Sequence, residues 1–126
     1  MKKILLVEGN LKEANQEFTE NGIKTHTESL QESISYYTNS LEIDSVNPSS
    51  DKDIFNKVKD LNKYEGLIWG GSSLNIYSDT KEIRRQIEFM KECQKKIKNI
   101  LAICWGMQVA VTAVSYTHLR AHETID

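Results

Sequence analysis

The chain has 126 residues, enough for one small domain, and its 27% charged and 39% hydrophobic residues are typical of a soluble globular protein. Its net charge of -2 argues against a nucleic-acid-binding surface, and no apolar run reaches the ~18 residues that a membrane-spanning helix needs. The two cysteines, Cys93 and Cys104, are too few for a disulfide framework. We therefore expect a reducing, cytoplasmic compartment, with neither a nucleic acid nor a membrane as partner.

Four apolar segments have the length and pattern of β-strands. Three are continuous, as in strands buried on both faces, and the last of these suits the centre of a parallel sheet. The other segment alternates apolar and polar residues, which indicates a strand near a sheet edge. The continuous segments lie at 2–8, 67–69 and 97–103, and the alternating one lies at 41–46.

The segments between these strands have helical spacing of their apolar residues. Thr27 is the expected N-terminal cap of the second helix, and Asp51 or Asp53 that of the third, in which Phe55 points inward. Strands that alternate with helices predict an open, mainly parallel α/β sheet with helices on both faces. Ligand sites in such sheets lie at the carboxyl ends of the strands. The expected helices span 11–21 (a short helix or an ordered loop), 27–37, 51–59 and 80–95.

Cys104 directly follows the last predicted strand and precedes a new helix. Gly106, two residues later, allows a tight turn and a close approach of the backbone. The thiol then lies against the N-terminus of the next helix, which favours the thiolate, the reactive form of cysteine. The pattern predicts a nucleophile elbow. The alternative is a buried structural cysteine, which is what we expect of Cys93 near the end of the helix at 80–95.

Residues 103–108, with the sequence ICWGMQ, resemble the nucleophile motif of class I glutamine amidotransferases, in particular stand-alone proteins similar to the glutaminase part of GMP synthase. The resemblance implies a flavodoxin-like fold and a hydrolase reaction in which Cys104 attacks the side-chain amide of glutamine, forms a thioester and releases ammonia. It implies no cofactor, and it allows for a synthetase partner that accepts the ammonia. No spacing of cysteine and histidine in the chain is typical of a metal site.

The same resemblance assigns roles around the nucleophile. Negative charge that develops on the amide oxygen is stabilised by backbone N–H groups, here those of Trp105 and of Gly71 or Gly70. The family usually has proline after the second glycine, where this chain has Ser72. Gln108 occupies the position that holds the glutamine substrate, the alternative being a glutamine on the helix surface. The side chains of the two tryptophans are expected to pack rather than react.

Residues 114–124 resemble one translated reading frame of a transposase-based sequencing adapter, and no amidotransferase segment. We therefore expect the N-terminal part of an amidotransferase domain at 1–113 and a non-native tail at 114–126. The family places its catalytic histidine, followed two residues later by glutamate, well beyond the nucleophile helix, and His118 and His122 come too early for this role. His26 begins a His-x-Glu sequence but precedes the nucleophile, so we expect a surface residue. A domain truncated after its nucleophile helix is expected to be inactive.

Two other classes of protein remain open. DJ-1/PfpI-type cysteine hydrolases or redox proteins share the fold but usually carry an acidic residue before the elbow and differ after it. An α/β binding module with an inert cysteine would not be an enzyme. Rapid reaction of Cys104 with alkylating reagents would distinguish an amidotransferase or a DJ-1/PfpI-type protein from the binding module with an inert cysteine.

Overall fold

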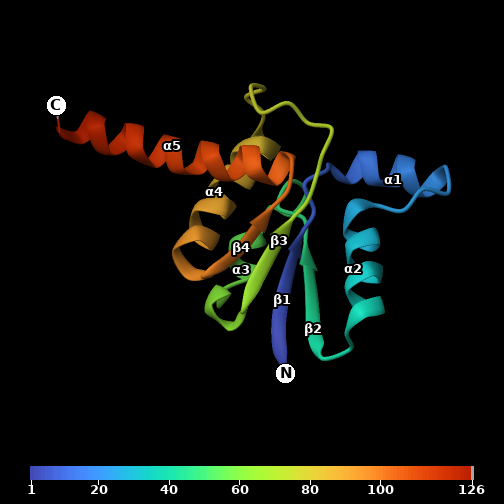
Figure 1. The fold of residues 1–126 in the computed structure, drawn as a ribbon. Coiled ribbons are helices and arrows are strands. Elements are labelled where there is room, and N and C mark those ends of the chain that lie inside the picture. Colours follow the sequence, from blue (N-terminus) through green and yellow to red (C-terminus); the bar gives the residue numbers. More distant parts are fainter. Residues whose placement is uncertain (126) are drawn as a thin grey trace.

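The computed structural model describes the backbone of residues 1–125 and the side chains up to Ser115. Four parallel strands form one sheet in the order β2-β1-β3-β4. Figure 1 shows α2 on one side of this sheet and α4 and α5 on the other. The elements are β1 (Lys2–Val7), α1 (Lys12–Glu20), α2 (His26–Tyr37), β2 (Leu41–Val46), α3 (Ile54–Lys57), the 3-10 helix η1 (Leu61–Lys63), β3 (Gly66–Trp69), α4 (Lys81–Lys96), β4 (Asn99–Ala102) and α5 (Trp105–Ile125). The predicted open α/β, flavodoxin-like architecture is confirmed.

The hydrophobic core lies between the sheet and the α4–α5 layer. Successive side chains of a strand point to opposite faces, so Leu5 and Val7 of β1 face the same way as Leu67 and Trp69 of β3. These side chains form one buried cluster with residues of both helices, among them Ile83, Phe89, Met90 and Val109. Leu6 points to the opposite face, where α2 lies, and is equally buried. The continuous apolar runs of β1 and β3 follow from this two-sided cover.

The last predicted strand is shorter than expected, and its central position in the sheet is wrong for the described chain. Ile97 belongs to the end of α4, and β4 pairs only with β3, at one edge of the four described strands. Leu101 is consequently 56% exposed and Ile103 38% exposed. The apolar side chains of this strand, which predicted burial on both faces, are therefore only partly covered by the described residues.

The predicted cap of the second helix is also wrong. Thr25, not Thr27, caps α2: its side chain accepts a hydrogen bond from the Glu28 backbone N–H, and the Glu28 side chain accepts one from the Thr25 N–H. Thr27 instead donates from its hydroxyl to the Glu8 carboxylate over 3.0 Å. The sequence Thr25-x-x-Glu28 is a capping box, a signal that identifies the cap where the choice of a single threonine failed.

The third helix departs from the sequence prediction in a similar way. It spans only Ile54–Lys57; Asp53, one of the two predicted caps, occupies the N-cap position, but its side chain makes no capping hydrogen bond. The Asp51 carboxylate binds the Asp53 backbone N–H and the Lys57 ammonium group, 3.0 Å away. Phe55 is 44% exposed rather than inward-facing, although its ring makes an edge contact with Phe89.

The last helix, α5, continues without a break through residue 113, the predicted end of the natural sequence. From residue 116 onward, the predicted non-native tail lies outside the residues whose side chains are described. The boundary at 113 therefore stays a prediction from the sequence.

Replacing Thr25 with alanine should lower the free energy of unfolding by about 1 kcal/mol, because the part-buried capping bond to the Glu28 N–H is lost. Urea denaturation followed by circular dichroism measures this change. Thr19→Ala is the matched control: its hydroxyl donates to the Asn15 carbonyl at an exposed position in α1, and its cost should stay below about 0.5 kcal/mol. Equal costs for the two variants would contradict the assignment of the cap.

Candidate functional site

The strand register brings three loops together at the carboxyl edge of the sheet. Val7 of β1 pairs with Trp69 of β3, and Trp69 pairs with Ala102 of β4. The residues that follow each strand therefore begin at the same level. Two residues after these register partners, the loops present Gly9, Gly71 and Cys104. Along the chain, 62 residues separate the first two and 33 the last two.

Cys104 has the backbone geometry of an elbow. Its φ angle is 52°, in the left-handed region that non-glycine residues rarely occupy, and its side chain is exposed. The turn reverses the chain between β4 and α5, and the Gln108 N–H closes the first helical bond to the Cys104 carbonyl over 3.1 Å. The expected strand-to-helix corner is therefore present, with its thiol accessible from outside.

Gly106 joins the elbow to the glycine loop of β3. Its backbone N–H lies 3.2 Å from the Gly70 carbonyl oxygen and 2.9 Å from that of Ile103. A Cβ atom at this position would lie 2.3 Å from the Trp69 carbonyl oxygen, far inside van der Waals contact. The two backbone segments can approach this closely only because residue 106 has no side chain.

The glycine loop and the elbow present backbone donors at this edge. Within the described residues, the N–H groups of Gly71 and Trp105 make no backbone hydrogen bond outside the helices and strands. Two hydrogen bonds also hold the glycine loop against the segment that follows β1: the Ser72 hydroxyl and the Ser73 N–H both donate to the Asn10 side-chain oxygen, over 2.8 and 3.2 Å. Ser72 thus ties the loop to the end of β1, at the position where the resembling family usually has proline.

A buried glutamine on α4 positions the Trp105 side chain. The Gln86 amide oxygen accepts from the indole N–H of Trp105 over 2.8 Å, and its NH₂ group donates to the Gly9 carbonyl and to the Ser49 hydroxyl. The side chain of Gln86 is fully buried, so these bonds form away from water. The Trp105 ring in turn lies against Gly9, where a Cβ would come within 2.6 Å of its Cδ1 atom. The expectation that this ring packs is supported by its burial.

Sequence reasoning missed Gln86, although one signal pointed to it. The apolar stripe of α4 contains Ile83, Ile87 and Met90, and Gln86 lies inside that stripe at helical spacing. A polar residue in such a stripe is buried and therefore needs hydrogen-bond partners. Here the partners belong to the loops at the ends of β1 and β2 and to the elbow.

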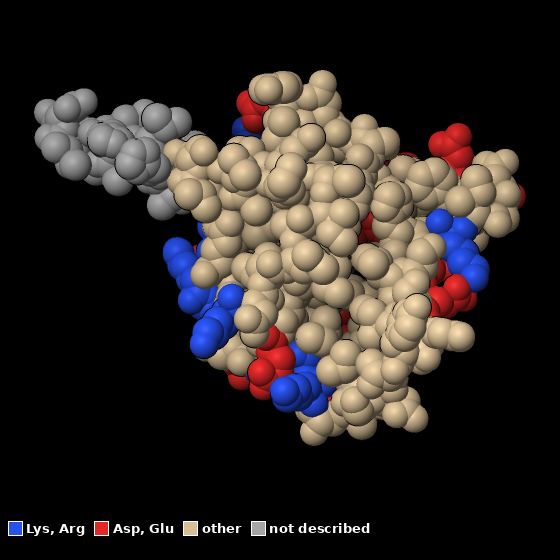
Figure 2. Space-filling model, in the orientation of Figure 1, with Lys and Arg blue, Asp and Glu red and all other residues tan. Residues whose placement is uncertain are grey.

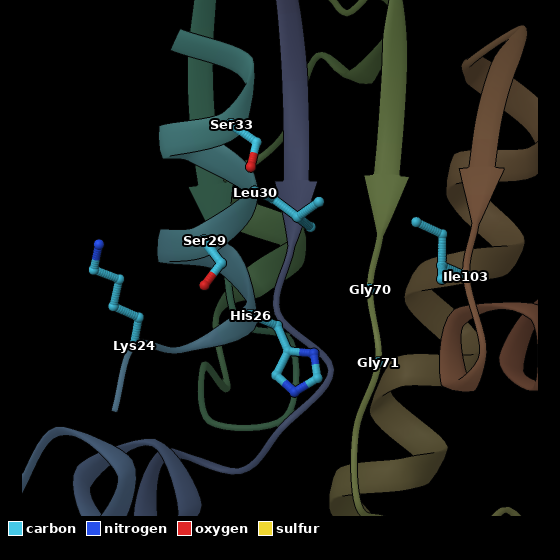
Figure 3. A pocket seen from close by; sticks show the side chains of 8 residues that line it. All are labelled: Lys24, His26, Ser29, Leu30, Ser33, Gly70, Gly71 and Ile103. Atoms are coloured by element: carbon cyan, nitrogen blue, oxygen red, sulfur yellow. The ribbon is translucent and has the colours of Figure 1, made fainter. Parts of the chain in front are cut away.

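His26 lies closer to these loops than its sequence position indicated. It is exposed, as expected, but its ring borders Gly71: a Cβ built on Gly71 would lie 3.1 Å from the His26 Cε1 atom. Figure 3 shows the ring beside Gly71, with Leu30 and Ile103 extending towards Gly70 from opposite sides. The pocket between them has a volume of about 360 Å³.

The other predicted site residues have these positions. Gln108 is exposed on the first turn of α5, four residues after Cys104. Cys93 is fully buried on α4, and burial raises the pKa of its thiol to about 12. Figure 2 shows Lys and Arg interspersed with Asp and Glu around the rim of one face, whose centre is largely uncharged. Among the described residues, no cluster of His, Cys, Asp and Glu has the arrangement of a metal site, and no helix combines the length and apolar character needed to cross a bilayer.

Two curated proteins are similar to part of this chain. A γ-glutamyl peptidase 4 from Arabidopsis thaliana is 37% identical over 69 residues, which are 55% of this chain and 28% of that protein. A γ-glutamyl-L-1-hydroxyisopropylamide hydrolase from a Pseudomonas species is 38% identical over 53 residues, which are 42% of this chain and 18% of that protein. The matched segments thus span less than a third of either relative. No family model and no solved structure matches the chain. The chain is weakly similar, over part of its length, to γ-glutamyl hydrolases of the class I glutamine amidotransferase-like type.

Replacing Gly106 with alanine should destabilise the protein by roughly 3 kcal/mol, because the new methyl group would collide with the Trp69 carbonyl. Helix propensity alone would give the opposite sign, since alanine is the better helix former. Gly22→Ala is the control: its φ of 71° costs about 1 kcal/mol for a side chain, but nothing lies within 4 Å of the new atom. Urea unfolding of both variants compares the costs, and a neutral or stabilising Gly106→Ala would contradict the described contact.

Cys104 should react with iodoacetamide near neutral pH at least about a hundred times faster than Cys93, because it is exposed whereas Cys93 is buried with its pKa raised to about 12. Mass spectrometry of tryptic peptides follows both rates in one sample, so Cys93 is the internal control. Similar slow rates at both positions would indicate an inert cysteine and favour the non-catalytic binding module.

Proposed function

We propose that the chain carries the nucleophile of a class I glutamine amidotransferase-like hydrolase, which cleaves a γ-glutamyl amide through a thioester at Cys104. One observation carries this proposal: an exposed cysteine in a left-handed elbow lies beside a glycine loop, and among the described residues the N–H groups of Gly71 and Trp105 have no backbone partner outside the helices and strands. Nucleophilic attack on an amide requires both parts, a presented thiolate and donors for the oxygen that becomes negative.

The positions of these groups support the following reaction. The Cys104 thiolate attacks the amide carbon, and the carbonyl oxygen becomes an oxyanion between the N–H groups of Gly71 and Trp105, with Gly70 as the neighbouring alternative. The tetrahedral intermediate collapses to a γ-glutamyl thioester on Cys104 as the amine leaves with a proton taken from a water molecule. Water then cleaves the thioester and restores the thiol. Backbone donors suit this task because they are fixed before the charge develops.

The substrate class is supported by the relatives, since both are named after the γ-glutamyl group. Glutamine, the simplest γ-glutamyl amide, would give glutamate and ammonia. Gln108, on the first turn of the helix that follows Cys104, is the proposed contact to the glutamyl part. A synthetase that accepts ammonia is a proposed partner only if the substrate is glutamine, because only glutamine would release ammonia. A reducing compartment such as the cytoplasm fits the requirement for a free thiol, and both cysteines are free.

The chloromethyl ketone analogue of glutamine tests this proposal without requiring turnover, because it places an alkylating carbon where the amide nitrogen would be. We expect it to label Cys104 with a rate that saturates, and free glutamine to slow the labelling. Gln108→Leu should weaken this competition about tenfold, the effect of losing one polar contact to the substrate, while the iodoacetamide rate of Cys104 changes little. Cys104→Ser is the control for labelling elsewhere. A linear, glutamine-insensitive rate would contradict a γ-glutamyl site.

A further inference from the structure

The side-chain amide of Gln86 is a fully buried polar group that takes no direct part in the proposed reaction. Its NH₂ group donates to the Gly9 carbonyl after β1 and to the Ser49 hydroxyl after β2, and its oxygen accepts from the Trp105 indole N–H. Exchanging the amide oxygen and nitrogen would set donor against donor at Trp105 and acceptor against acceptor at Gly9. The amide therefore has one orientation that satisfies all three partners.

The end of Gln86 is fixed by parts of the fold outside the elbow. Its neighbour on α4, Arg85, donates from its guanidinium group to the backbone carbonyls of Pro48 and Ser49. Two consecutive residues of α4 thus hold Ser49, one at its backbone and one at its hydroxyl. Ser49 is itself 2% exposed, so these bonds form away from water.

The Trp105 ring is held at two places. Its N–H donates to Gln86 over 2.8 Å, and its Cδ1 edge faces Gly9, where a Cβ atom would lie 2.6 Å away. Trp105 is only 2% exposed and belongs to the buried core cluster. A ring that is fixed at its polar atom and at one edge cannot rotate without losing a contact. Gln86 therefore helps to fix the position of Trp105, the first residue of α5.

The backbone N–H of Trp105 points out of the start of α5. The Cys104 carbonyl belongs to the same peptide group and accepts from the Gln108 N–H over 3.1 Å, so it points into the helix. The N–H and the C=O of a trans peptide group point in opposite directions, and the first N–H groups of a helix have no partner within it. The helical bond thus sets the direction of this donor, whereas the anchored side chain of Trp105 sets its position.

We propose that Gln86 is a positioning residue for the hydrolysis: acting through the Trp105 side chain, it holds the Trp105 N–H where this donor binds the oxyanion. The inference rests on the proposed function, because it needs the Trp105 N–H as an oxyanion donor. Without Gln86, the indole N–H would be buried with no acceptor, which is unfavourable. Movement of the ring towards another partner would relieve this cost, and the start of α5 would move with it.

Two alkylating reagents, applied to the full chain, separate the position of the donor from the reactivity of the thiol. In both reactions the Cys104 sulfur forms a bond to carbon as a halide ion leaves. The limiting rate with the chloromethyl ketone analogue of glutamine depends on the donors, because its carbonyl oxygen occupies the oxyanion position, whereas iodoacetamide requires only the thiolate. Gln86→Leu should lower the ratio of the first rate to the second at least about tenfold.

Gln94→Leu is the matched control, since Gln94 is another glutamine of α4 and donates to the Ala110 carbonyl of α5, over 3.1 Å, rather than to the elbow. It should leave the ratio unchanged. Trp105→Phe keeps an aromatic ring but removes the indole N–H, and it should lower the ratio as Gln86→Leu does. Combining Gln86→Leu with Trp105→Phe should lower it no further than either change alone, because both remove the same bond.

An unchanged ratio in either single variant, or a double variant whose loss equals the product of the two single losses, would overturn the positioning role while the proposed function stands. If circular dichroism shows that Gln86→Leu does not fold, the ratio for Trp105→Phe decides. A linear, glutamine-insensitive reaction of the unmodified chain with the chloromethyl ketone would instead remove the proposed function, and the positioning role with it.

Discussion

The contact between Gly106 and the end of β3 is the constraint on which the geometry of this site depends. A side chain at residue 106 would collide with the Trp69 carbonyl, and the N–H of Gly106 is shared between the carbonyls of Gly70 and Ile103. The contact sets how near the elbow comes to the glycine loop. The left-handed backbone at Cys104 is the cost of this arrangement, since a non-glycine residue in that region stores strain. Strain of this kind persists where surrounding contacts hold the chain in place.

Those surrounding contacts are polar side chains buried beneath the loops. Beyond the strand ends no ladder of hydrogen bonds continues, so the backbone groups there need other partners. Gln86 donates to the Gly9 carbonyl and Asn10 accepts from the Ser73 N–H, while Gln86 and Glu8 also bind the side chains of Trp105 and Thr27. A hydrophobic core alone would bury the strands and leave the orientation of these loops open. The polar network adds the positional precision that catalysis by backbone donors requires.

The fold and the elbow at Cys104 could be predicted from the sequence because both depend on local patterns. Apolar runs predicted the strands, and the residues around Cys104 and Gly106 predicted the elbow. Contacts between distant segments were harder to predict: the position of β4 depends on which strand lies beside it, and the proximity of His26 to Gly71 depends on how the start of α2 packs against the sheet. Thr27 was mistaken for a cap because two threonines lie within one turn, and only the pairing of Thr25 with Glu28 separates them. The burial of Gln86 could have been predicted, because it is a polar residue inside the apolar stripe of α4.

The central claim is that the thiol of Cys104 and the N–H groups of the glycine loop and the elbow act on the same amide carbon. A crystal structure of the adduct between Cys104 and the chloromethyl ketone analogue of glutamine measures this most directly. The account predicts that the oxygen of the adduct lies about 2.7–3.1 Å from the backbone nitrogens of Trp105 and of Gly71 or Gly70. An adduct whose oxygen points into solvent, with these donors unoccupied, would contradict it.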